Sequence, residues 1–428
     1  MRLRLQNIGI VSKADINING IAVITGENDS GKSTVGKVLY SIIRALNPNQ
    51  ETFDASRKNF VSKKFDELLS LLSRSKSSNE NDSKIIKGIF DKNINRFFNV
   101  LSVDDYEENI DELLAEVDSS MKNHSSKTLQ ENLRRIINEI EERKNISIDS
   151  SQYINFEISE FLNLEFGNQI KNNFLPEKSL IEIKTNLDTA TFNFENNNVK
   201  IDKIPIAFPY KDVIFIESPL YINEKKTGFN SNSLRDKKNY LNYKINKKNI
   251  TKDIFNDNRD EINHFNKIIT EIIKGDFGFD DKNRIVFKKN SVDFSMNSVA
   301  TGIKTFGAIQ LLIENNSLSS DTLLIIDEPE IHLHPMWQIL YAEILVRLSK
   351  EFAIPLIITS HSPYFIEAIE IFSKKYNYEE SVDFYFSEKS ENNLYSKIFN
   401  VNNNLTKIYS TIAGASYTLR KINHELNN

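Results

Sequence analysis

The sequence predicts an α/β fold in which a mixed β-sheet with flanking helices is interrupted by a large helical insertion. A β-branched run at Ile21–Thr25 precedes a glycine-rich loop, and helically spaced apolar residues follow from Val35. Two later apolar runs, which begin at Leu323 and Pro355, end in polar residues and predict buried strands. Residues 51–178 are instead mostly polar and helically spaced, with little glycine or proline. These observations predict an α/β core with a second, helical part.

Composition narrows the class of protein. A chain of 428 residues is long enough for one large α/β core and a second lobe. Its net charge of -5 gives no general attraction to nucleic acid or acidic membranes, so such binding would need a local patch. The absence of cysteine excludes disulfides, thiol nucleophiles and cysteine-ligated zinc. The first residues lack an apolar core of signal-peptide length, and no run of about 18 apolar residues follows. We therefore expect a cytoplasmic protein with no membrane contact.

The N-terminal elements surround a phosphate-binding motif. Alternating apolar residues in Met1–Ile18 predict a hairpin that leads into the first buried strand, and Lys32–Asn47 has the apolar spacing of a helix. Between them, Gly26 to Ser33 fit the pattern G-x-x-x-x-G-K-[ST]. The glycines let backbone N–H groups approach a polyphosphate, while the lysine reaches the β- and γ-phosphates and the Ser33 hydroxyl holds Mg²⁺. The predicted nucleotide-binding residues are Gly26, Glu27, Asn28, Asp29, Ser30, Gly31, Lys32, Ser33 and Thr34.

The central part of the chain predicts helices and then strands. The helical stripes in residues 51–178 are short and interrupted, which favours a compact lobe over an extended coiled-coil arm. Strand patterns follow at Leu180–Ile183, Thr191–Phe194, Val199–Ile201 and Val213–Ile216.

A basic, tyrosine-containing segment occupies residues 225–252. Alternating cationic and aromatic side chains can bind phosphates and stack on bases, so DNA is one predicted partner. A solvated face or loop is the interpretation we favour, because the chain as a whole is acidic. The residues concerned include Arg235, Lys237, Lys238, Tyr240, Tyr243, Lys244, Lys247 and Lys248.

Polar residues at the ends of the two later strands predict catalytic chemistry. Asp327 and Glu328 follow the run Leu323–Ile326, and carboxylates there can contact the Mg²⁺ shell and activate an attacking water, respectively. His361 follows the strand that begins at Pro355, where an imidazole can sense a γ-phosphate through a hydrogen bond. The nearby pair His332 and His334 lacks a third ligand at useful spacing, so packing or a dimer contact is favoured over a metal site.

The three motifs GENDSGKST, IIDEPEIHLHP and ITSHSP, in this order, resemble the ABC-type P-loop ATPase head of the OLD-like and SMC-like AAA group. This resemblance implies ATP and Mg²⁺ as cofactors, with catalytic roles for Lys32, Glu328 and His361 and a metal site at Ser33 and Asp327. The resemblance covers roughly Met1–Asn47 and Val292–Ile369. We expect residues 1–50 and 179–428 to form the two parts of the head and residues 51–178 to form an insertion lobe.

A fourth segment, Asn297–Gly307, resembles the divergent signature of the same group. In such heads the signature of one subunit completes the ATP site of another, which implies a homodimer or a higher homo-oligomer. A plain helix cap before Ile303–Leu312 is the alternative interpretation. The resemblance assigns γ-phosphate contacts on a partner's site to Ser298, Thr301, Gly302 and Lys304.

The resemblance also indicates a biological role. No D-x-D pair follows His361, and the remaining chain is too short for the Toprim domain of OLD-type nucleases, so we expect no nuclease site. The whole resembles ATPase subunits of bacterial anti-phage defence systems, Septu-like or PARIS-like, which control a separately encoded nuclease or toxin. An SMC-like DNA-repair or chromosome-associated ATPase and a slowly hydrolysing, nucleotide-gated scaffold are the alternatives.

Overall fold

The computed structural model describes residues 1–48, 151–167, 169–195, 198–203, 208–218, 222, 235–246 and 259–411, with single positions between 53 and 140. The chain divides into two compact units. The larger consists of Met1–Asn47, Asn155–Gly228 and Leu234–Asn428, and the smaller of Pro48–Ile154 and Phe229–Ser233. Most of the predicted insertion lobe lies outside the described residues, and its boundaries at residues 51 and 178 stay predictions.

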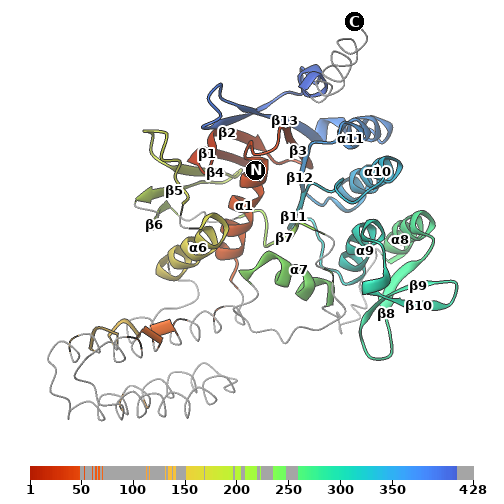
Figure 1. The fold of residues 1–428 in the computed structure, drawn as a ribbon, viewed down its shortest axis with the longest axis horizontal. Helices are drawn as coiled ribbons and strands as arrows, with labels where there is room; N and C mark the ends of the chain where they lie inside the picture. The colour runs from red at the N-terminus through yellow and green to blue at the C-terminus, as the bar shows by residue number, and fades with distance from the viewer. Residues whose placement is uncertain are drawn as a thin grey trace, which may run out of the picture. The chain divides into compact units, whose positions relative to one another are not determined.

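The larger unit is built on a sheet of 11 described strands, ordered β6-β5-β4-β1-β2-β14-β13-β3-β12-β11-β7 (Figure 1). Neighbouring strands from β6 to β2 are antiparallel, and those from β13 through β3, β12 and β11 to β7 are parallel. The sheet is therefore mixed, as the sequence predicts. Its strands are β1 (Arg2–Ile8), β2 (Val11–Asn17), β3 (Ile21–Gly26), β4 (Leu180–Lys184), β5 (Thr189–Glu195), β6 (Asn198–Lys203), β7 (Asp212–Ile216), β11 (Thr322–Asp327), β12 (Leu356–Ser360), β13 (Val382–Lys389) and β14 (Ser396–Asn400).

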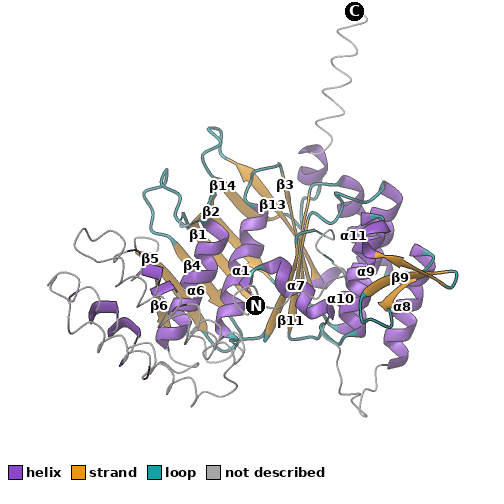
Figure 2. Cartoon of the chain, turned by 60° about the horizontal axis from the view of Figure 1, so that its bottom comes forward, coloured by secondary structure: helices purple, strands orange, loops and turns teal. Residues whose placement is uncertain are grey.

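Helices cover the parallel part of the sheet. Residues on one face of the strands, such as Val23 and Ile326, belong to a core shared with α8 to α11. The opposite face receives α1, which comes so close that a Cβ atom at Gly36 would lie 2.9 Å from Ile325 Cγ2. Figure 2 shows the helices beside the strands. Their bounds are α1 (Lys32–Leu46), α6 (Ser151–Phe166), α7 (Lys237–Asn246), α8 (Arg259–Ile273), α9 (Thr301–Glu314), α10 (Pro335–Phe352) and α11 (Pro363–Lys375).

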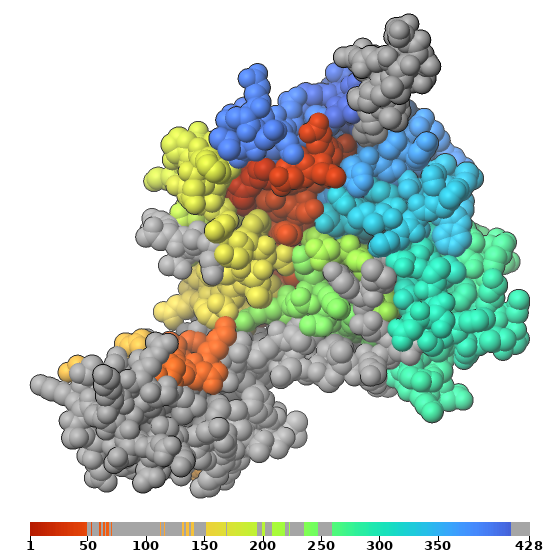
Figure 3. Space-filling view, in the orientation of Figure 1, coloured from red at the N-terminus to blue at the C-terminus, as the bar shows by residue number. Residues whose placement is uncertain are grey.

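A second sheet of three strands precedes α9 in the chain. It is antiparallel and contains β8 (Asp276–Phe279), β9 (Ile285–Lys289) and β10 (Val292–Ser295). Phe277 of this sheet packs so tightly against α9 that a Cβ atom at Gly307 would lie 2.2 Å from its ring. Figure 3 shows the α8–α9 region, coloured green to cyan, as one contiguous part of the visible face.

The smaller unit contributes few described residues, and those within the sequence range 53–140 are helical. Lys64 lies 2.6 Å from Glu139 and 2.9 Å from Glu67, and Arg135 lies 2.8 Å from each of the same two carboxylates. This ion-pair network joins helical segments that are far apart in the sequence.

Three cations in and just before α7 do not lie on the solvated face that the sequence favours. Arg235 lies 2.6 Å from Glu157, Lys237 lies 2.7 Å from Glu165, and Lys244 pairs with Asp212. The three cationic side chains are only 10%, 10% and 14% exposed. The interpretation is wrong for these residues because the acidic partners come from distant elements, α6 and β7. Lys247 and Lys248 lie outside the described residues.

Candidate functional site

Two glycines shape the loop that follows β3. Gly26 has a φ of 145° and Gly31 a φ of 81°, values that residues with a side chain rarely adopt. A Cβ atom at Gly26 would lie 2.4 Å from the carbonyl oxygen of Ser387, and one at Gly31 would lie 2.6 Å from Val11 Cγ2. The loop therefore passes close to β13 and β2 before it leads into the N-terminus of α1. Such a backbone suits a polyphosphate, because N–H groups at a helix start attract anions.

Lys32, the first residue of α1, is held inside this loop. Its Nζ donates hydrogen bonds to the carbonyl oxygens of Gly26, at 3.1 Å, and Glu27, at 2.7 Å. Burial lowers the pKa of Lys32, and the charges of nearby acids, Glu328 foremost, oppose that shift. The ammonium group is thus poorly solvated, and its hydrogen bonds within the described part of the chain go to neutral carbonyls. Phosphate oxygens would be stronger partners for it.

Ser33 and Asp327 meet although they lie 294 positions apart in the sequence. Ser33 Oγ donates to Asp327 Oδ1 at 2.9 Å. The hydroxyl of Thr359 donates to the same carboxylate oxygen. This contact arises because β3, β12 and β11 are parallel neighbours whose carboxyl ends lie at one edge of the sheet. A hydroxyl and a carboxylate side by side are oxygen donors of the kind that Mg²⁺ prefers.

Glu328 directly follows β11 and has a left-handed backbone, with a φ of 47°. That conformation costs roughly 1–2 kcal/mol for a residue with a side chain. Its N–H group donates to Thr359 Oγ1 at 3.1 Å, which ties the turn to the neighbouring strand β12. Strand β11 therefore ends at Asp327, and the chain turns at Glu328. The two neighbouring carboxylates then contact different groups, Ser33 and Thr359 for Asp327 and His361 for Glu328.

His361 lies beside Glu328. Its Nδ1 atom is 3.5 Å from Glu328 Oε1, and its side chain is 42% exposed. Glu330, a residue for which the sequence indicates no role, comes equally close: its Oε1 lies 3.4 Å from the same Nδ1. The sequence shows a further acid three positions after Asp327, but it does not show that this acid lies next to His361, which is 31 positions later.

The signature segment begins with a short 3₁₀ turn at Met296–Ser298, and α9 starts at Thr301. Ser298 is exposed, whereas Lys304 is buried. The N-cap of α9 is Ala300 and no side-chain hydrogen bond caps the helix, which argues against the alternative interpretation as a plain helix cap. A Cβ atom at Gly302 would lie 3.1 Å from the carbonyl oxygen of His332, which places the helix start against the segment that follows the acids. The assignment of these residues to a partner's site stays a prediction.

The two histidines after the acids are exposed. His334 is the N-cap of α10, and its Nδ1 accepts from the N–H of Met336 at 3.4 Å. Among the described residues, no group of three or more His, Asp or Glu side chains is arranged to hold a metal ion. The capping contact gives His334 a structural role that needs no metal.

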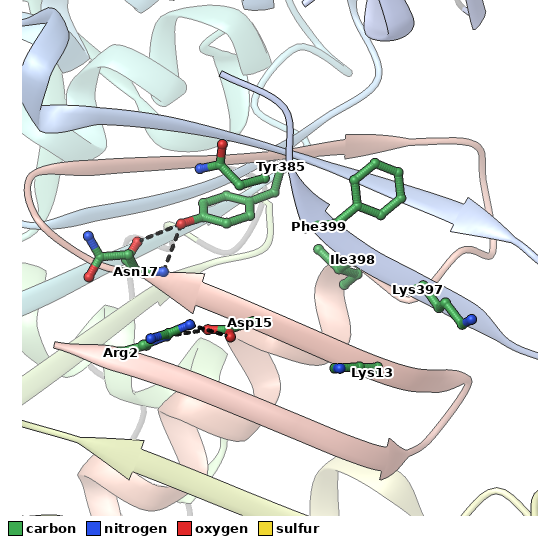
Figure 4. A pocket seen from close by; sticks show the side chains of 9 residues that line it. Arg2, Lys13, Asp15, Asn17, Tyr385, Lys397, Ile398 and Phe399 are labelled. Atoms are coloured by element: carbon green, nitrogen blue, oxygen red, sulfur yellow. Dashed lines mark hydrogen bonds and ion pairs between the residues drawn. The ribbon is translucent and has the colours of Figure 1, made fainter. Parts of the chain in front are cut away.

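A separate pocket of about 760 Å³ lies on β1, β2, β13 and β14 (Figure 4). Within it, Arg2 Nε donates to Asp15 Oδ1 at 2.5 Å, and Tyr385 Oη accepts from the backbone N–H of Asn17 at 2.7 Å. The hydrogen bond from Arg2 holds the pKa of Asp15 below its usual range. None of the residues that line this pocket belongs to the glycine-rich loop or the acid pair.

The glycine-rich loop at the end of a parallel strand, followed by α1 and faced by two acids, defines a P-loop ATPase. Residues 21–367 match the model of the family described as "AAA domain, putative AbiEii toxin, Type IV TA system". The chain belongs to this family. None of the described helices has the length and apolar character needed to cross a membrane.

Individual relatives are distant. The Retron Ec83 probable ATPase of Escherichia coli is 35% identical over 97 residues, which are 20% of this chain and 17% of that protein. The SMC head domain from Thermotoga maritima aligns over 94% of this chain and 98% of its own, with 11% identity and a TM-score of 0.40. The structure described as the SmcHead bound to the C-winged helix domain of ScpA aligns over 95% and 98%, with 10% identity and a TM-score of 0.39.

Proposed function

We propose that this chain hydrolyses ATP with Mg²⁺, dimerises head to head, and controls a separately encoded nuclease or toxin in bacterial anti-phage defence. The observation that carries the enzymatic part is the hydrogen bond from Ser33 Oγ to Asp327 Oδ1, which joins the first two sequence motifs at one edge of the sheet. The third motif reaches the same place, because the hydroxyl of Thr359 donates to the same carboxylate oxygen and His361 lies beside Glu328. The family description and the name of the retron relative support the defence part.

In this proposal the loop from Gly26 to Thr34 would hold the phosphates of ATP. Lys32 would exchange its two backbone carbonyls for phosphate oxygens, and Ser33 with Asp327 would hold Mg²⁺. The bound metal would supply positive charge that neutralises the phosphates. No nuclease site is assigned to the chain itself, so cleavage would belong to its partner.

Glu328 and His361 act on the water and the γ-phosphate in this proposal. The Glu328 carboxylate accepts a hydrogen bond from the attacking water and orients it. His361 Nδ1 faces the carboxylates of Glu328 and Glu330 at 3.5 Å and 3.4 Å. Its other ring nitrogen then serves as the group that senses the phosphate.

The surface around the site supports the proposed dimer. Ile331 is 56% exposed, Met336 is 59% exposed and Tyr364 is 55% exposed, and all three closely follow the acids or His361 in the chain. Exposed apolar side chains support a covered surface where they form a contiguous patch, which is what the proposal expects of these three. In the proposal a second copy covers them and contributes Ser298, Thr301, Gly302 and Lys304 to the γ-phosphate.

The test is to purify the chain together with the product of its neighbouring gene and to measure mass and turnover with and without ATP and Mg²⁺. We expect a stable complex, an ATP-dependent increase in mass, and turnover that Lys32→Ala abolishes. Unchanged turnover in Lys32→Ala would refute the site. An ATP-dependent dimer that binds DNA and no effector would instead support the SMC-like alternative.

A further inference from the structure

Glu330 is a buried carboxylate whose hydrogen bonds converge on one oxygen. Its side chain is only 4% exposed. Oε1 accepts from the N–H of His361 at 2.7 Å, from Ser360 Oγ at 2.9 Å and from the N–H of Ser362 at 3.2 Å. The three donors span the end of β12 and the turn that leads into α11. One acid of the segment after β11 thus fixes the complete backbone turn that carries His361.

We infer that Glu330 is a positioning residue for ATP hydrolysis, which holds His361 at the distance from Glu328 that the reaction needs. The inference rests on the proposed ATPase function. Glu330 does not touch the substrate in this role, because its Oε1 atom contacts Ser360, His361 and Ser362.

The hydrogen bonds of the two Glu330 carboxylate oxygens support a positioning role rather than a role in packing alone. A buried ionised carboxylate is costly unless hydrogen bonds compensate it. Oε2 is buried and has no hydrogen-bond partner among the described residues, while Oε1 has three. A group that served only to fill space would be better replaced by an apolar side chain. The carboxyl group of Glu330 instead lies where it orders backbone N–H groups next to the imidazole.

The position of the imidazole agrees with this assignment. His361 Nδ1 lies 3.4 Å from Glu330 Oε1 and 3.5 Å from Glu328 Oε1, so the two carboxylates face the same ring nitrogen. Glu330 therefore acts on both the backbone and the side chain of His361. Its bonds to the backbone set the place of the residue, and its carboxylate faces the Nδ1 atom of the ring.

A second contact holds the same turn from α10. Ser362 Oγ donates to Gln338 Oε1 at 2.6 Å, and Gln338 Nε2 donates to the carbonyl oxygen of Leu333 at 3.0 Å. This contact should keep the turn folded when Glu330 is changed. A variant of Glu330 is thus expected to displace His361 while the surrounding helices remain in place.

The experiment is a double-variant cycle on the full chain, with ATP turnover and the binding of a fluorescent ATP analogue as separate measurements. Glu330→Ala should lower kcat about 100-fold, the loss expected for a misplacement of about 1 Å at a reacting group. Analogue affinity should change less than about twofold, because the phosphate loop is intact. In a His361→Ala background, adding Glu330→Ala should lower kcat by less than about threefold, since the positioned group is already absent.

Two further variants make the result decisive. Glu330→Gln keeps an acceptor oxygen and should lose about tenfold in kcat; it replaces Glu330→Ala in the cycle if the alanine variant does not fold. Glu343→Ala is the matched control, because it removes another contact between α10 and α11, the 2.8 Å pair with Lys375, and should leave kcat unchanged.

The inference and the proposed function fail in different ways. Turnover that Glu328→Gln leaves unchanged would overturn the proposed function. Turnover that Glu328→Gln abolishes but Glu330→Ala preserves would overturn only the role of Glu330. Losses from Glu330→Ala and His361→Ala that multiply in the double variant would also overturn it, because the two residues would then act independently.

Discussion

Replacing Lys237 with glutamate tests whether α7 is a solvated face or part of the core. Lys237 Nζ lies 2.7 Å from Glu165 and 3.7 Å from Glu217, and it sits 4.5 Å from the centre of the Phe215 ring. The side chains of Lys237 and Glu165 are each only 10% exposed. Lys237→Glu would therefore place a third carboxylate next to two others in a poorly solvated site.

The expected cost follows from that burial. Removing one partner of a buried ion pair destabilises a protein by about 3–5 kcal/mol, because the remaining charge stays buried. Exposed charges of a solvated face contribute only about 0–1 kcal/mol. Urea unfolding of the full chain distinguishes the two values. DNA binding, measured in parallel, should not change in any folded variant.

Lys238 provides the matched control, because it is the next residue of α7 and is exposed. Lys238→Glu should shift the free energy of unfolding by less than about 1 kcal/mol. Equal effects of the two substitutions, or a loss of DNA binding by a stable Lys237→Glu variant, would refute the reasoning and restore a nucleic-acid role for this helix.

Three further predictions concern the site and the sheet. Glu328→Gln should retain ATP binding and trap an ATP-dependent dimer, detected by light scattering; a variant that stays monomeric in saturating ATP would argue against the composite site. Gly26→Ala should abolish nucleotide binding in a calorimetric titration, because the added Cβ atom would lie 2.4 Å from a backbone oxygen of β13; wild-type affinity would show that the loop can move. Asp15→Asn should cost less than about 1 kcal/mol at neutral pH, since the pair with Arg2 is partly exposed. Because folding lowers the pKa of Asp15, this cost should be present above the unfolded-state pKa and should vanish as the pH falls through the folded-state pKa. Acid unfolding of the wild-type and Asp15→Asn proteins would show this loss.

Elements defined by nearby residues were predictable. The hairpin of Met1–Ile18 is β1 and β2, and the helix expected at Lys32–Asn47 is α1, Lys32–Leu46. The strand expected at Val213–Ile216 lies within β7. Apolar periodicity and the placement of glycine depend on residues close together in the sequence, so these elements can be predicted from the sequence alone.

Local residue patterns thus predict the glycine loop, its strand and helix, and the acids and histidine at strand ends. Which of these groups meet depends on the three-dimensional fold. It places Ser33 against Asp327 and brings Glu330 to the turn of His361. It also pairs β13 with β3 inside the sheet. Strand order and the burial of charges on α7 depend on contacts between residues far apart in the chain, and local periodicity carries no record of those contacts.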